Sequence, residues 1–148
     1  MHSNFKFQSA FAESEILTFN TLPHFCTTAL HMGQARKFNL IEGEVLLQSI
    51  NHYLAHIELF EYSLRQDASI DFLLSEPSLL MYVVQHKGAC FLCYRPAGEY
   101  HKVIPAGIHK ILVITFRPDW LIYKSKKLIA LKPLIACFNE SENRHVNL

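Results

Sequence analysis

Two histidines and a glutamate close together, His52, His56 and Glu58, are the residues best suited to chemistry. If they lie on one β-strand, their even spacing puts all three side chains on the same face. Two imidazoles and a carboxylate with open coordination positions can bind iron, manganese or zinc. His101 and His109, from later strands, could complete the ligand set. The segment therefore raises the hypothesis of a metal site.

The spacing of these residues argues against that hypothesis. Metal-dependent cupin enzymes have two His separated by one residue, a Glu a few residues on, and a later His. Here the two His are four apart and Glu58 follows the second by two, while only Pro105 to His109 is similar to the later half of the signature. Nine His in 148 residues also make chance clustering common. We predict no catalytic metal and no cofactor.

The cysteines and glycines suggest no other catalytic centre. Cys90 and Cys93 have zinc-finger spacing, but residues three apart on a strand point to opposite faces, and no second close pair completes a site. The five glycines stand singly, without a nucleophile elbow, a phosphate-binding loop or a dinucleotide fingerprint. We predict a protein that is not an enzyme and has no catalytic residues.

The stretch from Leu79 to Phe116 indicates the fold. Four apolar runs, rich in β-branched and aromatic residues, are separated by Gly88, by Pro96 to Gly98 and by Pro105 to Gly107. This rhythm is typical of consecutive antiparallel strands. The connections are too short for crossover helices, so we expect hairpins, assembled into a sandwich or barrel.

The preceding residues continue the β pattern. Residues 1–13, with Phe5, Phe7 and Phe11, read as an arm or an edge element. Residues 53–64 contain no Gly or Pro and also fit a helix, but their β-rich surroundings favour a strand with one packed face and one face toward a cavity. The candidate strands of this half are Ile16 to Phe19, Phe25 to Met32, Phe38 to Ile41, Val45 to Ile50, Tyr53 to Leu64 and Ser69 to Phe72.

After Phe116 the period changes to that of a helix. Asp119 can cap a helix that begins at Trp120, and Pro133 precedes a second short helix, Leu134 to Phe138. The apolar side chains of this tail form one stripe, which packs against the strands or forms a dimer surface. The stripe includes Trp120, Leu128, Leu131, Leu134 and Ile135.

Several of these segments together carry a family resemblance. They are the strand ending at Lys87-Gly88, the turn Pro96 to Tyr100, Pro105 to His109, and the exit from Thr115 to Leu121. In this order they resemble the amino-terminal sensor domain of arabinose-regulator (AraC-type) transcription factors, most clearly over residues 79–138. The resemblance implies a mainly β, cupin-like barrel (a double-stranded β-helix, or jelly roll) of about eight strands followed by two short helices.

The resemblance also implies a function. We expect residues 1–148 to be a single sensor domain, with a barrel over about 14–117 and a helical tail over 119–138. Such a domain binds a small-molecule effector inside the barrel, forms a homodimer through the helices that follow it, and signals to a helix-turn-helix DNA-binding domain that this chain does not contain. Two alternatives stay open: a small metal-dependent cupin enzyme (an isomerase or an oxygenase), and a dimerisation module with a filled barrel.

A small-molecule pocket needs a few polar or aromatic groups among apolar walls. A one-residue shift in strand phase would exchange the inward and outward sets. The candidate residues of the barrel interior are His56, Glu58, Tyr82, Tyr94, His101 and His109.

Composition limits the possible partners. The net charge of +1 argues against a surface that neutralises nucleic-acid phosphates, so DNA would be reached only through the missing domain. Half of the residues are apolar and 18% are charged, as in soluble globular proteins. No apolar run is long enough to span a membrane, and the first residues lack the features of a secretion signal. We therefore expect a cytoplasmic protein.

Overall fold

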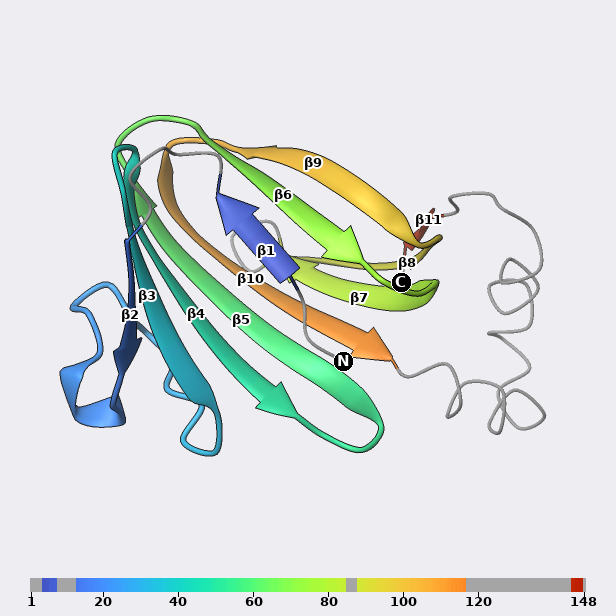
Figure 1. Ribbon diagram of the computed structural model, residues 1–148, viewed down its shortest axis with the longest axis horizontal. Helices are drawn as coiled ribbons and strands as arrows, with labels where there is room; N and C mark the ends of the chain where they lie inside the picture. Colours follow the sequence, from blue (N-terminus) through green and yellow to red (C-terminus); the bar gives the residue numbers. More distant parts are fainter. Residues whose placement is uncertain (1–3, 8–12, 85–87, 117–144, 148) are drawn as a thin grey trace.

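The computed structural model describes residues 4–7, 13–84, 88–116 and 145–147. Antiparallel strands make up most of this part, and its one helical element is the single 3-10 turn η1 (Phe19–Thr21), so the predicted mainly-β class is confirmed. Figure 1 labels the strands, whose bounds are β1 (Asn4–Phe7), β2 (Glu13–Leu17), β3 (Gln34–Leu40), β4 (Gly43–Asn51), β5 (Ala55–Leu64), β6 (Ala68–Leu74), β7 (Ser78–Val84), β8 (Ala89–Arg95), β9 (Gly98–Ile104), β10 (Gly107–Phe116) and β11 (His145–Asn147).

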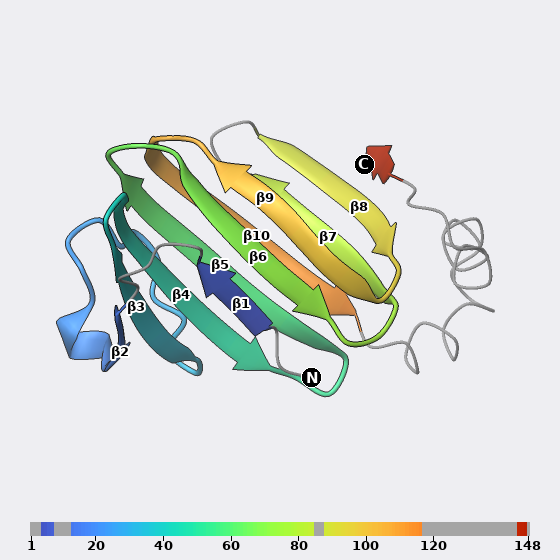
Figure 2. The ribbon, with the colours of Figure 1, turned by 45° about the horizontal axis from the view of Figure 1, so that its top comes forward.

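The strands form two sheets. The large sheet has the order β11-β8-β7-β10-β5-β4-β3-β2, and the small sheet has the order β1-β6-β9. The small sheet lies over one face of the large sheet, as both views of the ribbon show (Figures 1 and 2). We call the face of the large sheet toward the small sheet the inner face, and the other the outer face.

The strands from β5 to β10 pair in a nested order. β7 pairs with β8, β6 pairs with β9, and β5 pairs with β10. The four expected strands of the central stretch are present, but only β7 and β8 form a hairpin. The prediction of hairpins at the next two turns was wrong, because the chain passes from one sheet to the other at Pro96 and again at Pro105. Gly107, which follows the second crossing, has a φ of 122°, a conformation that favours glycine.

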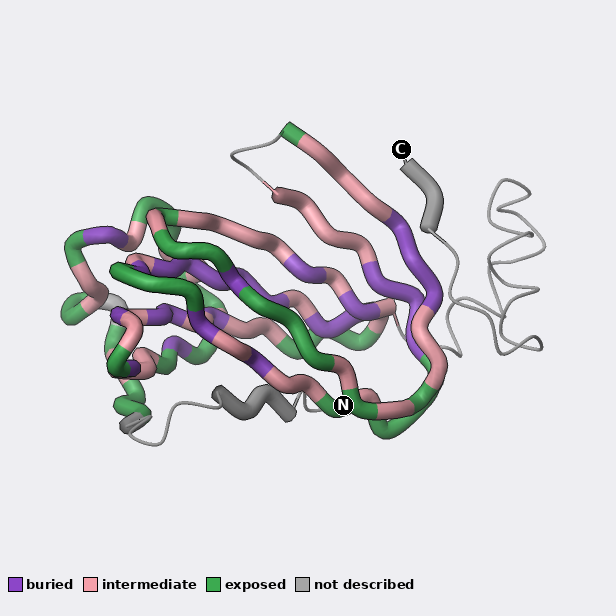
Figure 3. The backbone as a smooth tube through the Cα atoms, turned by 90° about the horizontal axis from the view of Figure 1, so that it is seen from above, coloured by how far each residue is buried: buried purple, intermediate pink, exposed green. Residues whose placement is uncertain are grey.

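β5 is the centre of the large sheet. It pairs with β4 on one side and with β10 on the other, and nearly all of its residues are buried. Figure 3 shows buried segments along the strands and exposed segments mostly at the connections. At the end of β5, Gly43 of the neighbouring strand lies so close that a Cβ atom would stand 2.3 Å from the carbonyl oxygen of Ser63. A larger residue at position 43 would therefore push the two strands apart.

The predicted strand from Phe25 to Met32 was wrong. This segment is a loop that packs on the outer face, where Phe25 contacts a small cluster with Ala35 and Leu46. Its backbone groups bond to side chains of the sheet instead of to another strand. Gln48 accepts a hydrogen bond from the Leu30 amide at 2.8 Å and donates one to the Thr28 carbonyl at 2.7 Å. Apolar residues alone therefore did not make this segment a strand.

Glu61 holds the same loop from β5. One carboxylate oxygen accepts hydrogen bonds from the Thr27 amide at 2.9 Å and from its hydroxyl at 2.8 Å, and lies 3.5 Å from Lys110 Nζ. The other oxygen accepts a hydrogen bond from Gln48 Nε2 at 3.3 Å. Burial raises the pKa of Glu61, but the hydrogen bonds from Thr27 and the nearby lysine outweigh it and hold the pKa below its ordinary value.

The predicted tail helices lie outside the described residues. The same is true of their apolar stripe. Among the described residues, no helix has the length and apolar character that crossing a bilayer requires. The residues of the predicted stripe, all outside the described part of the chain, are Trp120, Leu128, Leu131, Leu134 and Ile135.

Candidate functional site

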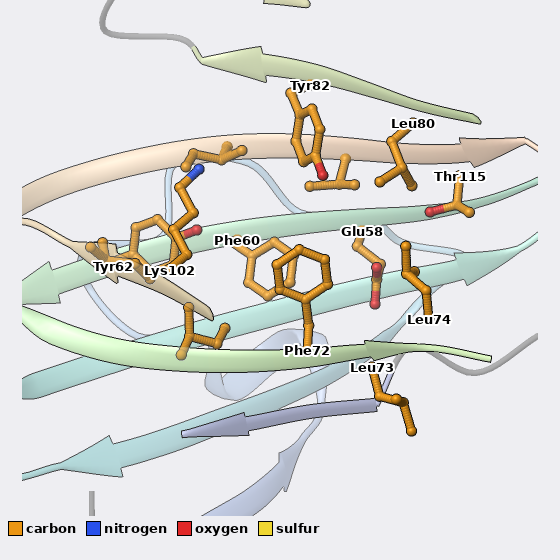
Figure 4. Close-up of a pocket in the computed structure, with 14 residues that line it drawn as sticks. Glu58, Phe60, Tyr62, Phe72, Leu73, Leu74, Leu80, Tyr82, Lys102 and Thr115 are labelled. Carbon is orange, nitrogen blue, oxygen red and sulfur yellow. The ribbon is translucent and has the colours of Figure 1, made fainter. Parts of the chain in front are cut away.

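A cavity of about 70 Å³ lies between the two sheets. We call it the inner cavity. A single water needs about 10–15 Å³ of such space, so the volume admits several waters or one compact molecule. Its walls come from five strands, β5, β6, β7, β9 and β10 (Figure 4). The lining residues are Glu58, Phe60, Tyr62, Ile70, Phe72, Leu73, Leu74, Leu80, Tyr82, Lys102, Ile104, Ile111, Val113 and Thr115.

The strand alternation explains this wall. On β5, the even-numbered residues Glu58, Phe60 and Tyr62 face the small sheet, and they are nearly inaccessible to solvent. Neighbouring strands contribute the residues in register with them: Val113 pairs with both Glu58 and Tyr82. The result is an apolar chamber into which only a few polar groups point.

Glu58 is the buried acid of this chamber. Its side chain is 2% exposed, and its Oε1 lies 3.2 Å from Nε2 of His56, which is also buried. The other ring nitrogen of His56, Nδ1, lies 2.7 Å from Oδ1 of Asn51. Because an amide oxygen only accepts, Nδ1 carries a hydrogen in this arrangement. Asn51 thus orients the imidazole, and the imidazole orients the carboxylate at the cavity wall.

A second, wider hollow adjoins the same pair. It has a volume of about 580 Å³ and lies over β2, β3 and β4 on the inner face, with Arg36, Ser49 and Asn51 among its residues. Both His56 and Glu58 border it, and Glu58 also borders the inner cavity. We place the candidate site in the inner cavity, because apolar walls with few convergent polar groups are typical of small-molecule sites. A ligand could extend past Glu58 into the wider hollow.

Lys102 is the cationic side chain among the residues that line the inner cavity. Lys102 Nζ lies 5.9 Å from the ring centre of Tyr82, and the Arg95 guanidinium lies 5.1 Å from the ring centre of Tyr100. Tyr100 also stacks on Phe72, with the ring centres 5.2 Å apart. Burial, with a smaller effect of Cys93, raises the pKa of Tyr82 despite the nearby Arg95. Its phenol is therefore a neutral hydrogen-bonding group at ordinary pH.

The structure brings together only part of the predicted site. His56, Glu58 and Tyr82 lie together around the inner face. His109 lies near the start of β10, where Nε2 is 3.1 Å from the Ala106 carbonyl oxygen, and its ring centre is 6.5 Å from that of Tyr62. It borders a separate hollow.

Tyr94 and His101 differ from the prediction in their strand phase. Tyr94 is buried on the outer face, since it pairs with Leu79 and alternates with the inward-facing Cys93. His101 is exposed on the outside of the small sheet, where Nδ1 is 2.8 Å from Asp71 Oδ1. Tyr94 and His101 are each the immediate chain neighbour of a residue whose side chain faces inward.

The possible metal ligands are also dispersed. His52 lies in the turn before β5, outside the strand, so it does not share a face with His56 and Glu58 as the spacing suggested. In the part of the chain that the structure describes, no three His, Cys, Asp or Glu side chains are grouped closely enough to hold a metal ion.

Sequence reasoning missed several residues of the wall. Phe72, Lys102 and Thr115 line the inner cavity but were not among the candidates. Thr115 could have been found from the alternation of side chains along the strands. Once Glu58 is placed inward, the register puts its partner Val113 on the inner face, and Thr115, two residues on, lies on the same face. For Phe72 and Lys102 the sheet partners were also needed, because they belong to the small sheet.

Comparison with known proteins adds no identification. The chain matches no family model, and no curated protein and no solved structure matches it significantly. The function therefore has to be argued from the site itself.

Proposed function

We propose that this chain is the effector-binding and dimerisation domain of an AraC-type transcriptional regulator. In this proposal the two sheets form a cupin-like jelly roll, and the inner cavity holds a small molecule. The nested pairing of β5 with β10, β6 with β9 and β7 with β8 supports the fold, because jelly rolls pair their strands in this nested way. The protein would act in the cytoplasm.

The observation that carries the proposal is the buried carboxylate of Glu58 on the wall of an apolar cavity. Burying a carboxylate is costly unless it is paired, and His56 provides the pairing. Placing such a group against space instead of against packed protein is typical of a ligand site. A bound effector would contact Glu58 with a polar group and Phe60 with its apolar part.

Signalling requires that the effector favour one of two states of the domain. β10 offers a direct connection. Thr115 of this strand lines the cavity, and β10 ends one residue later, at Phe116. The residues that we propose as the dimer surface, from Trp120 onward, follow immediately in the chain. Occupancy of the cavity could therefore shift β10 and the segment after it.

A fusion experiment tests this proposal. The chain is joined to a DNA-binding domain that represses a reporter only as a dimer, and the reporter is measured with and without a library of small molecules. We expect repression by the fusion, a change in repression by at least one compound, and loss of that change in Glu58→Gln. A fusion that neither dimerises nor responds to any compound would overturn the proposal. Glu15→Gln, a change at an exposed residue, is the control.

A further inference from the structure

The inner cavity has two polar ends of opposite charge. Figure 4 shows Glu58 at one end and Lys102 at the other, with Phe60 and Phe72 between them. Glu58 comes from the centre of the large sheet, and Lys102 comes from the edge strand of the small sheet. The charges thus belong to different sheets, and the apolar space separates them.

The cationic end has more than one donor. Lys102 is exposed, and its Nζ lies 5.9 Å from the ring centre of Tyr82, whose hydroxyl points toward the middle of the cavity in Figure 4. Arg95 lies close to Tyr82 and Tyr100, and its Nε is buried without a hydrogen-bond partner among the described residues. A buried donor of this kind is uncommon in a folded protein. Lys102 and Tyr82 line the cavity and provide positive charge and hydrogen-bond donors for an anion, and Arg95 adds positive charge beside Tyr82.

The anionic end of the cavity provides negative charge and a hydrogen-bond acceptor. Glu58 is an acceptor held in place by His56 at 3.2 Å, and Thr115 lies on the same part of the wall. Between the ends, the rings of Phe60 and Phe72 can contact only an apolar segment. The volume of about 70 Å³ excludes a bulky ligand from this chamber.

We propose that the inner cavity takes a compact carboxylic acid that carries a hydroxyl or ammonium group at its other end. The carboxylate would lie toward Lys102, the short apolar segment between Phe60 and Phe72, and the hydroxyl or ammonium group at Glu58. This inference rests on the proposed function and adds the chemical class of the effector. A purely apolar ligand would desolvate Glu58 without offering it a donor, which disfavours binding.

NMR titration of the full chain with four slender probes tests the inference. δ-Hydroxyvalerate and δ-aminovalerate have both end groups, valerate has only the acid, and n-pentanol has only the hydroxyl. We expect one of the two bifunctional probes to bind about tenfold more tightly than valerate and n-pentanol, since a hydrogen bond to a charged group contributes that much. The shifted amides should include those of Thr115, Phe72 and Lys102.

Two variants test which residue binds each end of the ligand. Lys102→Met should remove the preference for the bifunctional probe over n-pentanol, and Glu58→Gln should reduce its preference over valerate. Lys37→Met, on the outer face, changes the same residue type and should leave both preferences intact. Because Glu58 is buried, its variant is checked for folding first; Lys102 is exposed, so its variant tests the inference even if Glu58→Gln unfolds.

Three results would overturn the inference: equal binding of n-pentanol or valerate, shifts confined to another part of the protein, or no binding of any probe. The proposed function fails separately. A reporter fusion that responds only to uncharged apolar compounds would reject the bipolar ligand but keep the effector domain. If a bifunctional probe binds to a chain that never dimerises, the bipolar ligand is kept and the proposed function is rejected.

Discussion

Glu58 and Glu61 are two buried carboxylates on the same strand, yet they have different surroundings. Three residues apart on β5, they point to opposite faces of the large sheet, and each is about 2% exposed. Glu61 is enclosed by donors: Thr27 and Lys110 at one oxygen and Gln48 at the other. Glu58 is held by His56 and borders two hollows.

The comparison distinguishes a carboxylate that stabilises the fold from one that is arranged to bind a ligand. A carboxylate whose oxygens are all bonded to the protein has no capacity left for a ligand, so Glu61 acts as an anchor for the loop over the outer face. A carboxylate oriented by a neighbour but facing a cavity is arranged for binding. Burial alone therefore does not identify a site, because both residues are equally buried.

The largest effect is expected for Glu61→Gln. Both oxygens of Glu61 accept hydrogen bonds from donors, so the amide NH₂ of Gln would face a donor whichever way it turns. The charge opposite Lys110 is lost as well. We expect a loss of about 3 kcal/mol in the free energy of unfolding, measured by urea denaturation. A loss below about 1 kcal/mol would show that the loop is not anchored by this residue.

Glu61 should also contribute to the pH dependence of the free energy of unfolding. The pKa of Glu61 is lower in the folded state than its ordinary value, so its contribution to stability is full above the ordinary pKa of a glutamate. It is lost as the pH falls from there through the lowered pKa. We expect the stability advantage of the natural chain over Glu61→Gln to shrink between about pH 6 and pH 3. An advantage that grows in acid would contradict the assignment.

Glu58→Gln should have a smaller effect on stability. The amide can still hydrogen-bond to His56, and the side chain borders space in which it can reorient. We expect a change of about 1 kcal/mol or less in the free energy of unfolding, by the same urea measurement. A loss as large as that of Glu61→Gln would mean that Glu58, too, is mainly structural.

The smallest effect is expected on the outside of the small sheet. His101 and Asp71 form a pair there, but the His101 side chain is half exposed. Exposed pairs contribute little, so His101→Gln should change the free energy of unfolding by less than about 0.5 kcal/mol. It should also leave ligand binding unchanged, although the spacing of the sequence had suggested this histidine for the interior.

The sequence was sufficient for the strands of the central stretch, because Gly88, Pro96 and Pro105 punctuate it. It was not sufficient for the connections between them, since a short Pro-containing turn can close a hairpin or carry the chain to another sheet. Phe25 to Met32 looked like a strand because it is apolar. Its backbone is instead satisfied by Gln48 and Glu61, a long-range arrangement that local pattern does not show.

The site residues show the same limit. The alternation along β5 places Glu58 with Phe60 on one face once any member of the strand is oriented. Tyr94 and His101 could not be oriented in this way, because each strand has two possible phases and only its partners decide between them. The register of β8 with β7 and of β9 with β6 supplies that decision.

The most direct measurement is the ligand response of a chain whose inner cavity is filled. Val113 lines the cavity on β10, so Val113→Phe should occupy its space while keeping the domain folded. Val83→Phe makes the same change on the outer face of β7 and is the matched control. We predict that Val113→Phe unfolds at a temperature close to that of the natural chain but loses the thermal shift caused by its ligand, while Val83→Phe keeps it. An undiminished ligand shift in a folded Val113→Phe chain would contradict the central claim.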